Sequence, residues 1–226
     1  MKRLRLSCCV VSLLAWLSSF VCFAAAEERA ELIPENKIAA LETELAAAKE
    51  TGSAARKKLA LRRVIREADA LLEQGQTAPN RYQVLGILFH GQKDLVGLDN
   101  SATNRSALLQ TCRQLAAAPN EYADIRLDAD LLLSQVELAR QGADLQARAD
   151  ALRPLVERYR DTEVEAKVIR IAMVMALEFG DTSLVGHLRQ VIAERFAGDL
   201  EMINFQREKL AGQVFGAPFL GRFEQS

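Results

Sequence analysis

Helix-breaking residues and disulfide-forming cysteines are scarce in this chain of 226 residues. It has five prolines, 12 glycines and four cysteines. Low proline and glycine content favours helix along most of the chain. Charge of one sign is also missing: 29 basic and 30 acidic side chains give a formal net charge of -1, which excludes the basic surface typical of nucleic-acid binding. A chain that is 50% hydrophobic and 26% charged is not of the disordered class.

Residues 1–26 have the pattern of a secretory signal peptide. Lys2, Arg3 and Arg5 precede an apolar run to Phe23, and three alanines end at Ala26. We therefore expect an exported protein of the periplasm or cell envelope, with no membrane contact after cleavage. An uncleaved transmembrane anchor is the alternative, since about 18 apolar residues can span a bilayer.

Cleavage there would remove most of the cysteines. Cys8, Cys9 and Cys22 precede the expected cut, so Cys112 is the one thiol that the exported chain would keep. One thiol makes neither an intramolecular disulfide nor a Cys-x-x-Cys redox pair nor a thiolate metal site. Cys112 is in phase with apolar neighbours, and we interpret it as a small buried hydrophobe.

From residue 35 onward, apolar residues recur with the period of a helix. The pattern predicts eight helices: 35–50, one ending at Gly75, 80–98, 102–117, 120–142, 144–159, 162–180 and one from 182 or 183 to 196. Each has one apolar face that must be covered. The sequence therefore predicts an all-α fold of antiparallel helix pairs, stacked as a solenoid or packed as an irregular bundle.

A weak internal repeat supports stacked pairs. Three residues recur 37 positions later, and an aspartate follows each copy: Leu155, Arg158, Tyr159 and Asp161, then Ile192, Arg195, Phe196 and Asp199. The pattern resembles the ends of second helices in tetratricopeptide-like repeats. We accordingly expect a helical hairpin over 27–78, a tetratricopeptide-like helical domain over 79–211 and a Gly/Phe-rich tail over 212–226.

The helical pattern ends after Leu210, where the composition changes. Phe215, Phe219 and Phe223 lie among glycines and one proline, a mixture that predicts no helix. Exposed phenylalanines promote association. We expect these three residues to be docking contacts, either with the final helices or with a partner.

Two motifs that resemble chemical sites are better explained by packing. Gly86 and Gly91 have the spacing of a phosphate loop, but Lys93 is one place late and no hydroxyl follows it, so we predict packing glycines within a helix. His90 and His187 are far apart in sequence and lack the spacing of metal ligands. We predict that both are packed or partly exposed helix residues.

Clusters of charge are similarly interpreted as solvated helix faces. Asp124 and Asp128, with Asp130 and Glu121 nearby, share a helix face and could hold a cation, but Arg126 is adjacent and solvation is the simpler explanation. The basic stretch over 56–66 predicts a solvent-facing surface or a partner contact. The residues thus indicate no catalytic, cofactor-binding or metal-binding site.

Four segments resemble the helical N-terminal region of exported bacterial TlpA-like thioredoxin-fold proteins: Glu121–Arg126, Asp128–Ser134, Glu157–Arg160 and Glu194–Asp199. In those proteins a redoxin domain follows the helices, and Val214–Phe223 resembles its beginning. The thioredoxin fold and its cysteine pair are missing from this chain, so the resemblance assigns no redox residue to any position.

The resemblance implies a non-catalytic exported scaffold whose protein partner is a thioredoxin-fold domain. The alternative is a fragment of a thiol-disulfide oxidoreductase with its catalytic domain beyond residue 226, which a continued reading frame encoding Cys-x-x-Cys would reveal. A small-ligand sensor formed by the helices is a third class.

Overall fold

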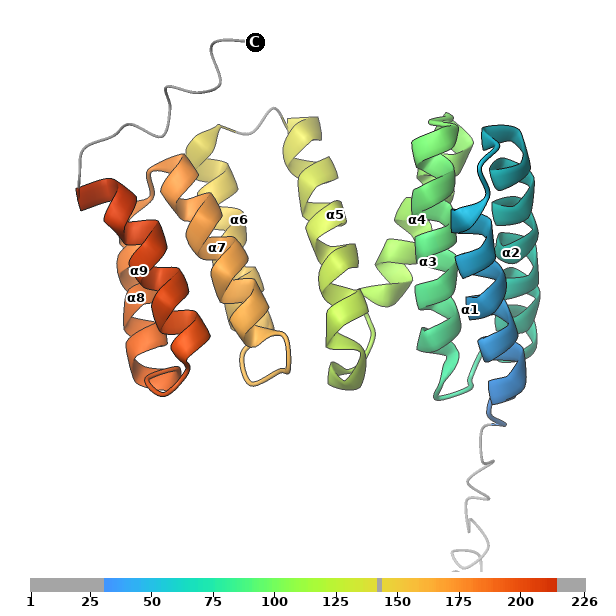
Figure 1. The fold of residues 1–226 in the computed structure, drawn as a ribbon, viewed down its shortest axis with the longest axis horizontal. Coiled ribbons are helices and arrows are strands. Elements are labelled where there is room, and N and C mark those ends of the chain that lie inside the picture. The colour runs from blue at the N-terminus through green and yellow to red at the C-terminus, as the bar shows by residue number, and fades with distance from the viewer. Residues whose placement is uncertain (1–30, 142–143, 215–226) are drawn as a thin grey trace, which may run out of the picture. The chain divides into compact units, whose positions relative to one another are not determined.

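A computed structural model of the chain describes residues 31–141 and 144–214. The expected signal peptide, residues 1–26, and the tail residues Phe215, Phe219 and Phe223 lie outside these ranges. Within them the fold is all-α, as predicted, and Figure 1 shows helices joined by short connections. The elements are α1 (Glu35–Glu50), α2 (Ala54–Gln74), α3 (Arg81–Leu98), α4 (Ala102–Leu115), the 3-10 turn η1 (Asn120–Tyr122), α5 (Ala123–Gln141), α6 (Leu145–Arg158), α7 (Glu165–Phe179), α8 (Thr182–Arg195) and α9 (Leu200–Val214).

Capping residues place most helix ends where the sequence predicts them. The side chain of Ser101 accepts a hydrogen bond at the start of α4, and Asp144 does so at the start of α6. Asp181 caps α8 in the same way. At the end of α7, Gly180 has a φ of 70°, a left-handed conformation that glycine adopts without steric cost.

Two predicted helix starts are wrong by about one turn. The hydroxyl of Thr162 donates to the carbonyl of Tyr159 instead of capping a helix, and α7 begins only at Glu165. Asn120 opens a 3-10 turn after Pro119, so α5 begins at Ala123. In both places a connecting turn uses residues that the apolar period alone attaches to the next helix.

The predicted end of the helical region is also too early. A ninth helix, α9, extends to Val214 and therefore past Leu210. One glycine inside a helix costs only about 1 kcal/mol relative to alanine, so Gly212 does not stop α9. Asp199 caps this helix by accepting a hydrogen bond from the backbone N–H of Met202 at 3.0 Å.

Successive helices form hairpins that pack in chain order. α1 packs on α2, α2 on α3, α3 on α4, and α4 on α5, and then α6 packs on α7 and α7 on α8. α1 also contacts α3, and α7 contacts α9, so in these two places a helix also touches the next helix but one (Figure 1). We call α1, α3, α5 and α7 the first helices and α2, α4, α6 and α8 the second helices.

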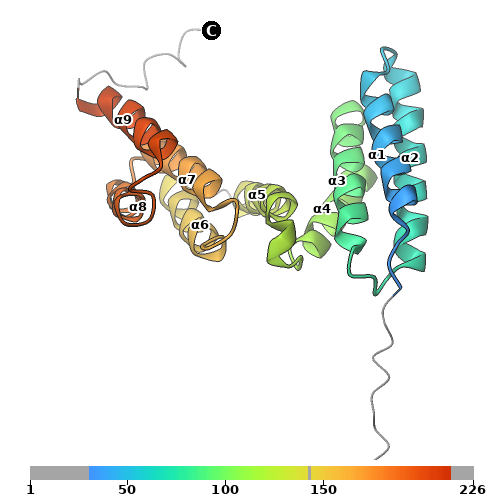
Figure 2. The same cartoon turned by 60° about the horizontal axis from the view of Figure 1, so that its bottom comes forward.

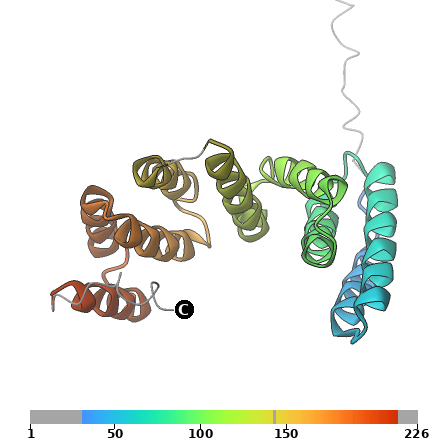
Figure 3. The ribbon, with the colours of Figure 1, turned by 90° about the horizontal axis from the view of Figure 1, so that it is seen from above.

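Helix α5 takes part in two hydrophobic cores. The N-terminal core is formed mainly by α1–α4, with Leu61 and Phe89 fully buried, and it includes Ala129 of α5. The C-terminal core is formed by α6–α9 around Tyr159, and it includes Leu127 of α5. Figure 2 and Figure 3 both show α5 between α4 and α6. The helix therefore has apolar residues on two sides.

A buried asparagine fixes the beginning of the described chain. Asn80 accepts a hydrogen bond from the backbone N–H of Ile33 at 3.0 Å and donates to the carbonyl of Ile33 at 2.8 Å. Both backbone groups of Ile33 are thereby satisfied, and Ile33 itself is buried in the N-terminal core. The segment before α1 is thus attached to the start of α3.

In the part of the chain that the structure describes, none of the helices is both long enough and apolar enough to cross a membrane.

Candidate functional site

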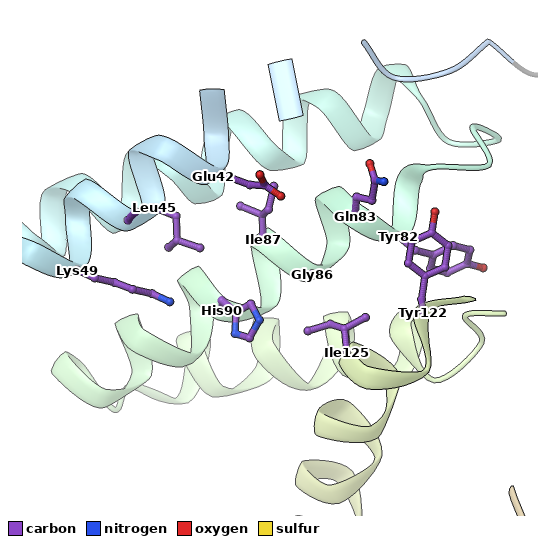
Figure 4. A pocket seen from close by; sticks show the side chains of 11 residues that line it. Glu42, Leu45, Lys49, Tyr82, Gln83, Gly86, Ile87, His90, Tyr122 and Ile125 are labelled. Atoms are coloured by element: carbon purple, nitrogen blue, oxygen red, sulfur yellow. The ribbon is translucent and has the colours of Figure 1, made fainter. Parts of the chain in front are cut away.

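First helices of three successive hairpins, with the turn before α5, line an open pocket of about 360 Å³ (Figure 4). Pockets that bind small ligands or side chains of partners have volumes of roughly 300–1,000 Å³. We call this site the first-helix pocket. Its lining residues are Glu42, Leu45, Ala46 and Lys49 of α1, Tyr82, Gln83, Gly86, Ile87 and His90 of α3, Tyr122 of η1 and Ile125 of α5.

The floor of the pocket is apolar. Leu45 and Ile87 are buried, and Ile125 is half-buried between them and the tyrosines. A Cβ atom added to Gly86 would lie 3.4 Å from Cγ1 of Ile125, so the backbone of α3 packs directly against this side chain of α5. Gly91 has the same relation to Ile65 of α2, at 3.4 Å. Both glycines lie inside α3, which confirms that they are packing glycines.

Figure 4 shows that the two ends of the pocket differ. Lys49 and His90 lie at one end, and the rings of Tyr82 and Tyr122 lie at the other, with centroids 5.4 Å apart. The Tyr82 hydroxyl donates to the carbonyl of Ala117 at 3.4 Å, which holds this ring against the connection after α4. The pocket therefore has an aromatic end, formed by the two tyrosines, and an opposite end formed by a lysine and a histidine.

His90 is half-buried, as predicted for a packed helix residue. Burial lowers the pKa of His90 below its ordinary value of 6.5, and repulsion from Lys49 and Lys93 lowers it further, whereas Asp128 and Asp94 act in the opposite direction. The ring is neutral at pH 7 and offers one N–H donor and one acceptor nitrogen.

Sequence reasoning singles out only Gly86 and His90 of this pocket. Tyr82 and Tyr122 come from different hairpins, and neither is part of a motif. The one available signal is Gly86 in the middle of an otherwise apolar helix, because a glycine there indicates close approach of a neighbour.

A second group of polar residues links α5 to α6. The Tyr159 hydroxyl donates to Oδ2 of Asp130 at 2.7 Å, and Nη1 of Arg158 lies 3.1 Å from the same oxygen. The guanidinium of Arg126 lies 4.9 Å from the centroid of the Tyr159 ring and donates to the carbonyl of Ala118 at 2.7 Å. We call Arg126, Asp130, Arg158 and Tyr159 the junction network.

The junction network corrects one sequence interpretation. Asp124 is exposed and forms an ion pair with Lys167 at 2.6 Å, as a solvated face requires, but Asp130 is only 5% exposed. Asp130 and Arg126 are in phase with Ala123 and Leu127, three and four residues apart along α5, and share their buried side. The apolar period misses this second side of α5 because two of its positions are charged.

Hydrogen bonding and burial determine the protonation of Tyr159. Burial raises its pKa far above 10, and the hydrogen bond to Asp130 raises it further. The phenol therefore stays neutral and acts as a donor over the whole physiological range. Nothing in this network lies on the first-helix pocket, so its evident role is to join α5 to α6.

The 37-residue repeat has a structural counterpart. Arg195, at the end of α8, pairs with Glu165 of α7 at 2.9 Å, just as Arg158, at the end of α6, pairs with Asp130 of α5. The helix caps Asp144 and Asp181 have the same 37-residue spacing. In both hairpins an arginine at the end of the second helix thus binds an acid on the first helix.

Cys112 and His187 lie outside the first-helix pocket and the junction network. Cys112 is fully buried in the N-terminal core, and burial raises its pKa to about 11, which confirms the small buried hydrophobe. His187 is partly exposed on α8, with Nε2 3.9 Å from a carboxylate oxygen of Glu157. Over residues 31–141 and 144–214, no three histidine, cysteine or acidic side chains are grouped so that they could hold a metal ion.

Comparison with known proteins adds no assignment: no family model, no curated protein and no solved structure matches this chain.

Proposed function

We propose that this chain is a non-catalytic protein-interaction module, exported to the bacterial cell envelope, that serves as a scaffold for a thioredoxin-like domain. The first-helix pocket is the observation that carries the proposal. A peptide segment laid over this pocket would touch three successive hairpins at once, which is how stacked helix pairs commonly bind extended or helical segments.

Both the open apolar floor and the polar rim support a binding role. Leu45, Ile87 and Ile125 provide apolar surface that a partner side chain can cover. Glu42 and Gln83 are exposed at the mouth, where they can bond to a peptide backbone. An apolar base with a few polar groups around it is typical of sites that recognise side chains.

Sequence patterns supply the compartment and the partner class. The signal-peptide pattern of residues 1–26 supports export. The resemblance of four helical segments to the region that precedes a redoxin domain supports a thioredoxin-fold partner. In this proposal the chain contributes a binding surface and its partner contributes any redox chemistry.

A photo-cross-linking amino acid at position 83 tests the proposal. Gln83 lies at the pocket mouth, so a benzoylphenylalanine there should cross-link a partner that occupies the pocket in living cells. Ala70, exposed on the second helix α2, is the matched control position. We expect a cross-linked product that contains a thioredoxin-fold protein at position 83 and none at position 70.

Equal cross-linking from both positions, or none from position 83, would contradict a docking role for the pocket. A cross-linked partner without a thioredoxin fold would contradict the partner class and leave the docking role intact.

A further inference from the structure

The two charged residues that line the first-helix pocket, Lys49 and Glu42, differ in whether an opposite charge lies beside them. Nζ of Lys49 has an acidic neighbour, Asp94, with an oxygen 3.8 Å away. The Glu42 carboxylate, by contrast, makes no hydrogen bond or ion pair with the residues that the structure describes. Of the charged side chains that line the pocket, Glu42 is therefore the one that has no opposite charge beside it.

The aromatic end of the pocket also attracts cations. The faces of tyrosine rings carry negative electrostatic potential, and cations bind over them within about 6 Å of the centroid. Arg81 already does so on this chain, because its Cζ lies 5.3 Å from the centroid of the Tyr82 ring. Tyr122 is half-buried beside Tyr82 and lines the pocket with it.

Acidic residues surround the aromatic end. Burial raises the pKa of Tyr122, and the nearby carboxylates of Glu121 and Glu35 raise it further, which indicates negative potential at this ring. One Glu35 oxygen accepts a hydrogen bond from Asn80, which fixes that carboxylate close to the start of α3. The same potential that disfavours a tyrosinate favours a cation.

The floor suits the stem of a long basic side chain. Arginine and lysine place their methylene groups on apolar surface and keep the charged head in a polar environment. Along the pocket, Leu45, Ile87 and Ile125 offer that apolar surface, and polar groups are offered by Glu42, drawn beside Ile87 in Figure 4, and by the two tyrosines at one end. Lys49, at the opposite end, would repel the cationic head and so set the direction of the side chain.

We propose that the first-helix pocket binds an arginine or lysine side chain of a partner peptide, with its stem on the apolar floor and its cationic head between Glu42 and the two tyrosines. This inference rests on the proposed function, because it names the chemistry of the partner segment that docks there.

Peptides that differ only in charge test the inference. The probes are acetylated, amidated pentapeptides Gly-Ser-X-Ser-Gly in which X is arginine or its neutral isostere citrulline, titrated into the purified protein and followed by NMR. We expect the arginine peptide to bind about fivefold more tightly, because ring and carboxylate both favour the charge. Equal affinity of the two peptides would overturn the inference.

Substitution of the acidic residue at the mouth supplies the matched control. Glu42→Gln should weaken the preference for arginine, because only the rings then favour the charge, whereas Glu50→Gln, exposed on the same helix but outside the pocket, should leave it unchanged. Both positions are on the surface, so both variants are expected to fold. A preference of undiminished size in Glu42→Gln would also overturn the inference.

The two histidines report where the peptide binds. His90 lines the pocket and His187 lies on α8, so the arginine peptide should shift the ring signals of His90 and not those of His187. The chain has only two histidines, and His187→Gln therefore assigns both sets of signals. Shifts at His187 alone would place the peptide elsewhere and overturn the inference.

The peptide titrations and the cross-linking experiment can fail independently. Cross-linking from position 83 without an arginine preference would overturn this inference and leave the docking role standing. An arginine preference without cross-linking would support the ligand chemistry and contradict the docking of a partner in cells.

Discussion

The N-terminal and C-terminal cores bury polar groups of opposite character. Of the buried polar side chains in the described chain, those associated with α1–α4 are neutral and those of α5–α9 are charged; they are Asn80, Gln92 and Thr111 against Arg126, Asp130 and Glu165. Neutral groups can be satisfied by nearby backbone, and the Thr111 hydroxyl donates to the carbonyl of Ala107 one turn earlier. Buried charges must be paired or hydrogen-bonded, and Asp130 and Glu165 are each paired with an arginine of the following helix.

This difference shows two ways of attaching one hairpin to the next. In the N-terminal half, apolar packing supplies the buried contact between helices, and ion pairs such as that of Arg63 with Glu44 lie on the surface. The first-helix side there remains open as a pocket. In the C-terminal half, an arginine of the second helix holds a buried acid of the first in two successive hairpins, and the two arginines are 37 residues apart. The second arrangement fixes geometry, but the loss of one member leaves a buried group unpaired.

The largest effect is expected where the unpaired group is most deeply buried. Asp130→Ala leaves the Tyr159 hydroxyl without its acceptor and Arg158 without its ion pair. We expect a loss of about 3 kcal/mol in the free energy of unfolding, measured by urea titration. Asp124→Ala, on the exposed side of the same helix, should change it by less than about 0.5 kcal/mol.

A double-mutant cycle separates the hydrogen bond from general disruption of α5. If the bond is responsible, Asp130→Ala should cost clearly less in a Tyr159→Phe background, where no hydroxyl is left to satisfy. Additive effects of the two substitutions would contradict the role assigned to this bond.

The same contrast explains what could be foreseen from the sequence. The apolar period and the caps Ser101 and Asp144 predict the all-α fold and most helix boundaries, because both signals are local. The buried side of α5 could not be recognised, because Arg126 and Asp130 occupy core positions that an apolar pattern excludes. Their burial depends on Tyr159, which is 29 residues beyond Asp130.

The candidate site was harder still to foresee. Tyr82 of α3 and Tyr122 of η1 meet through tertiary packing, and contacts of this kind leave little trace in a single sequence. The sequence around Glu42 is that of an ordinary helix, and only the fold brings its carboxylate into one pocket with residues of other helices. Position in the fold, not residue type, distinguishes these side chains.

The two contacts between an arginine and a buried acid are expected to contribute equally to stability. Arg195→Gln and Arg158→Gln each remove one pair between a second helix and a first helix. We expect each to lower the free energy of unfolding by about 1.5 kcal/mol, because the abandoned carboxylates of Glu165 and Asp130 are both buried. Arg189→Gln, exposed on α8, should have little effect in the same urea titration.

Costs that differ by more than about 1 kcal/mol would show that the 37-residue spacing is not an energetic repeat. In that event the hairpin with the larger loss would be the better-fixed part of the C-terminal core.

The smallest expected effect is a pH dependence of the free energy of unfolding that comes from His90, in the N-terminal half. Since burial lowers the pKa of His90 in the folded state, the unfolded chain binds more protons near pH 6 than the folded chain does. The free energy of unfolding must therefore rise with pH up to the unfolded pKa of about 6.5 and fall as the pH decreases below it. His90→Gln should flatten this dependence between pH 5 and 7, whereas His187→Gln, on the exposed surface of α8, serves as the control. If His90→Gln leaves the slope undiminished, the pH response belongs to other titratable groups. The N-terminal half would then not differ from the C-terminal half through protonation of this histidine.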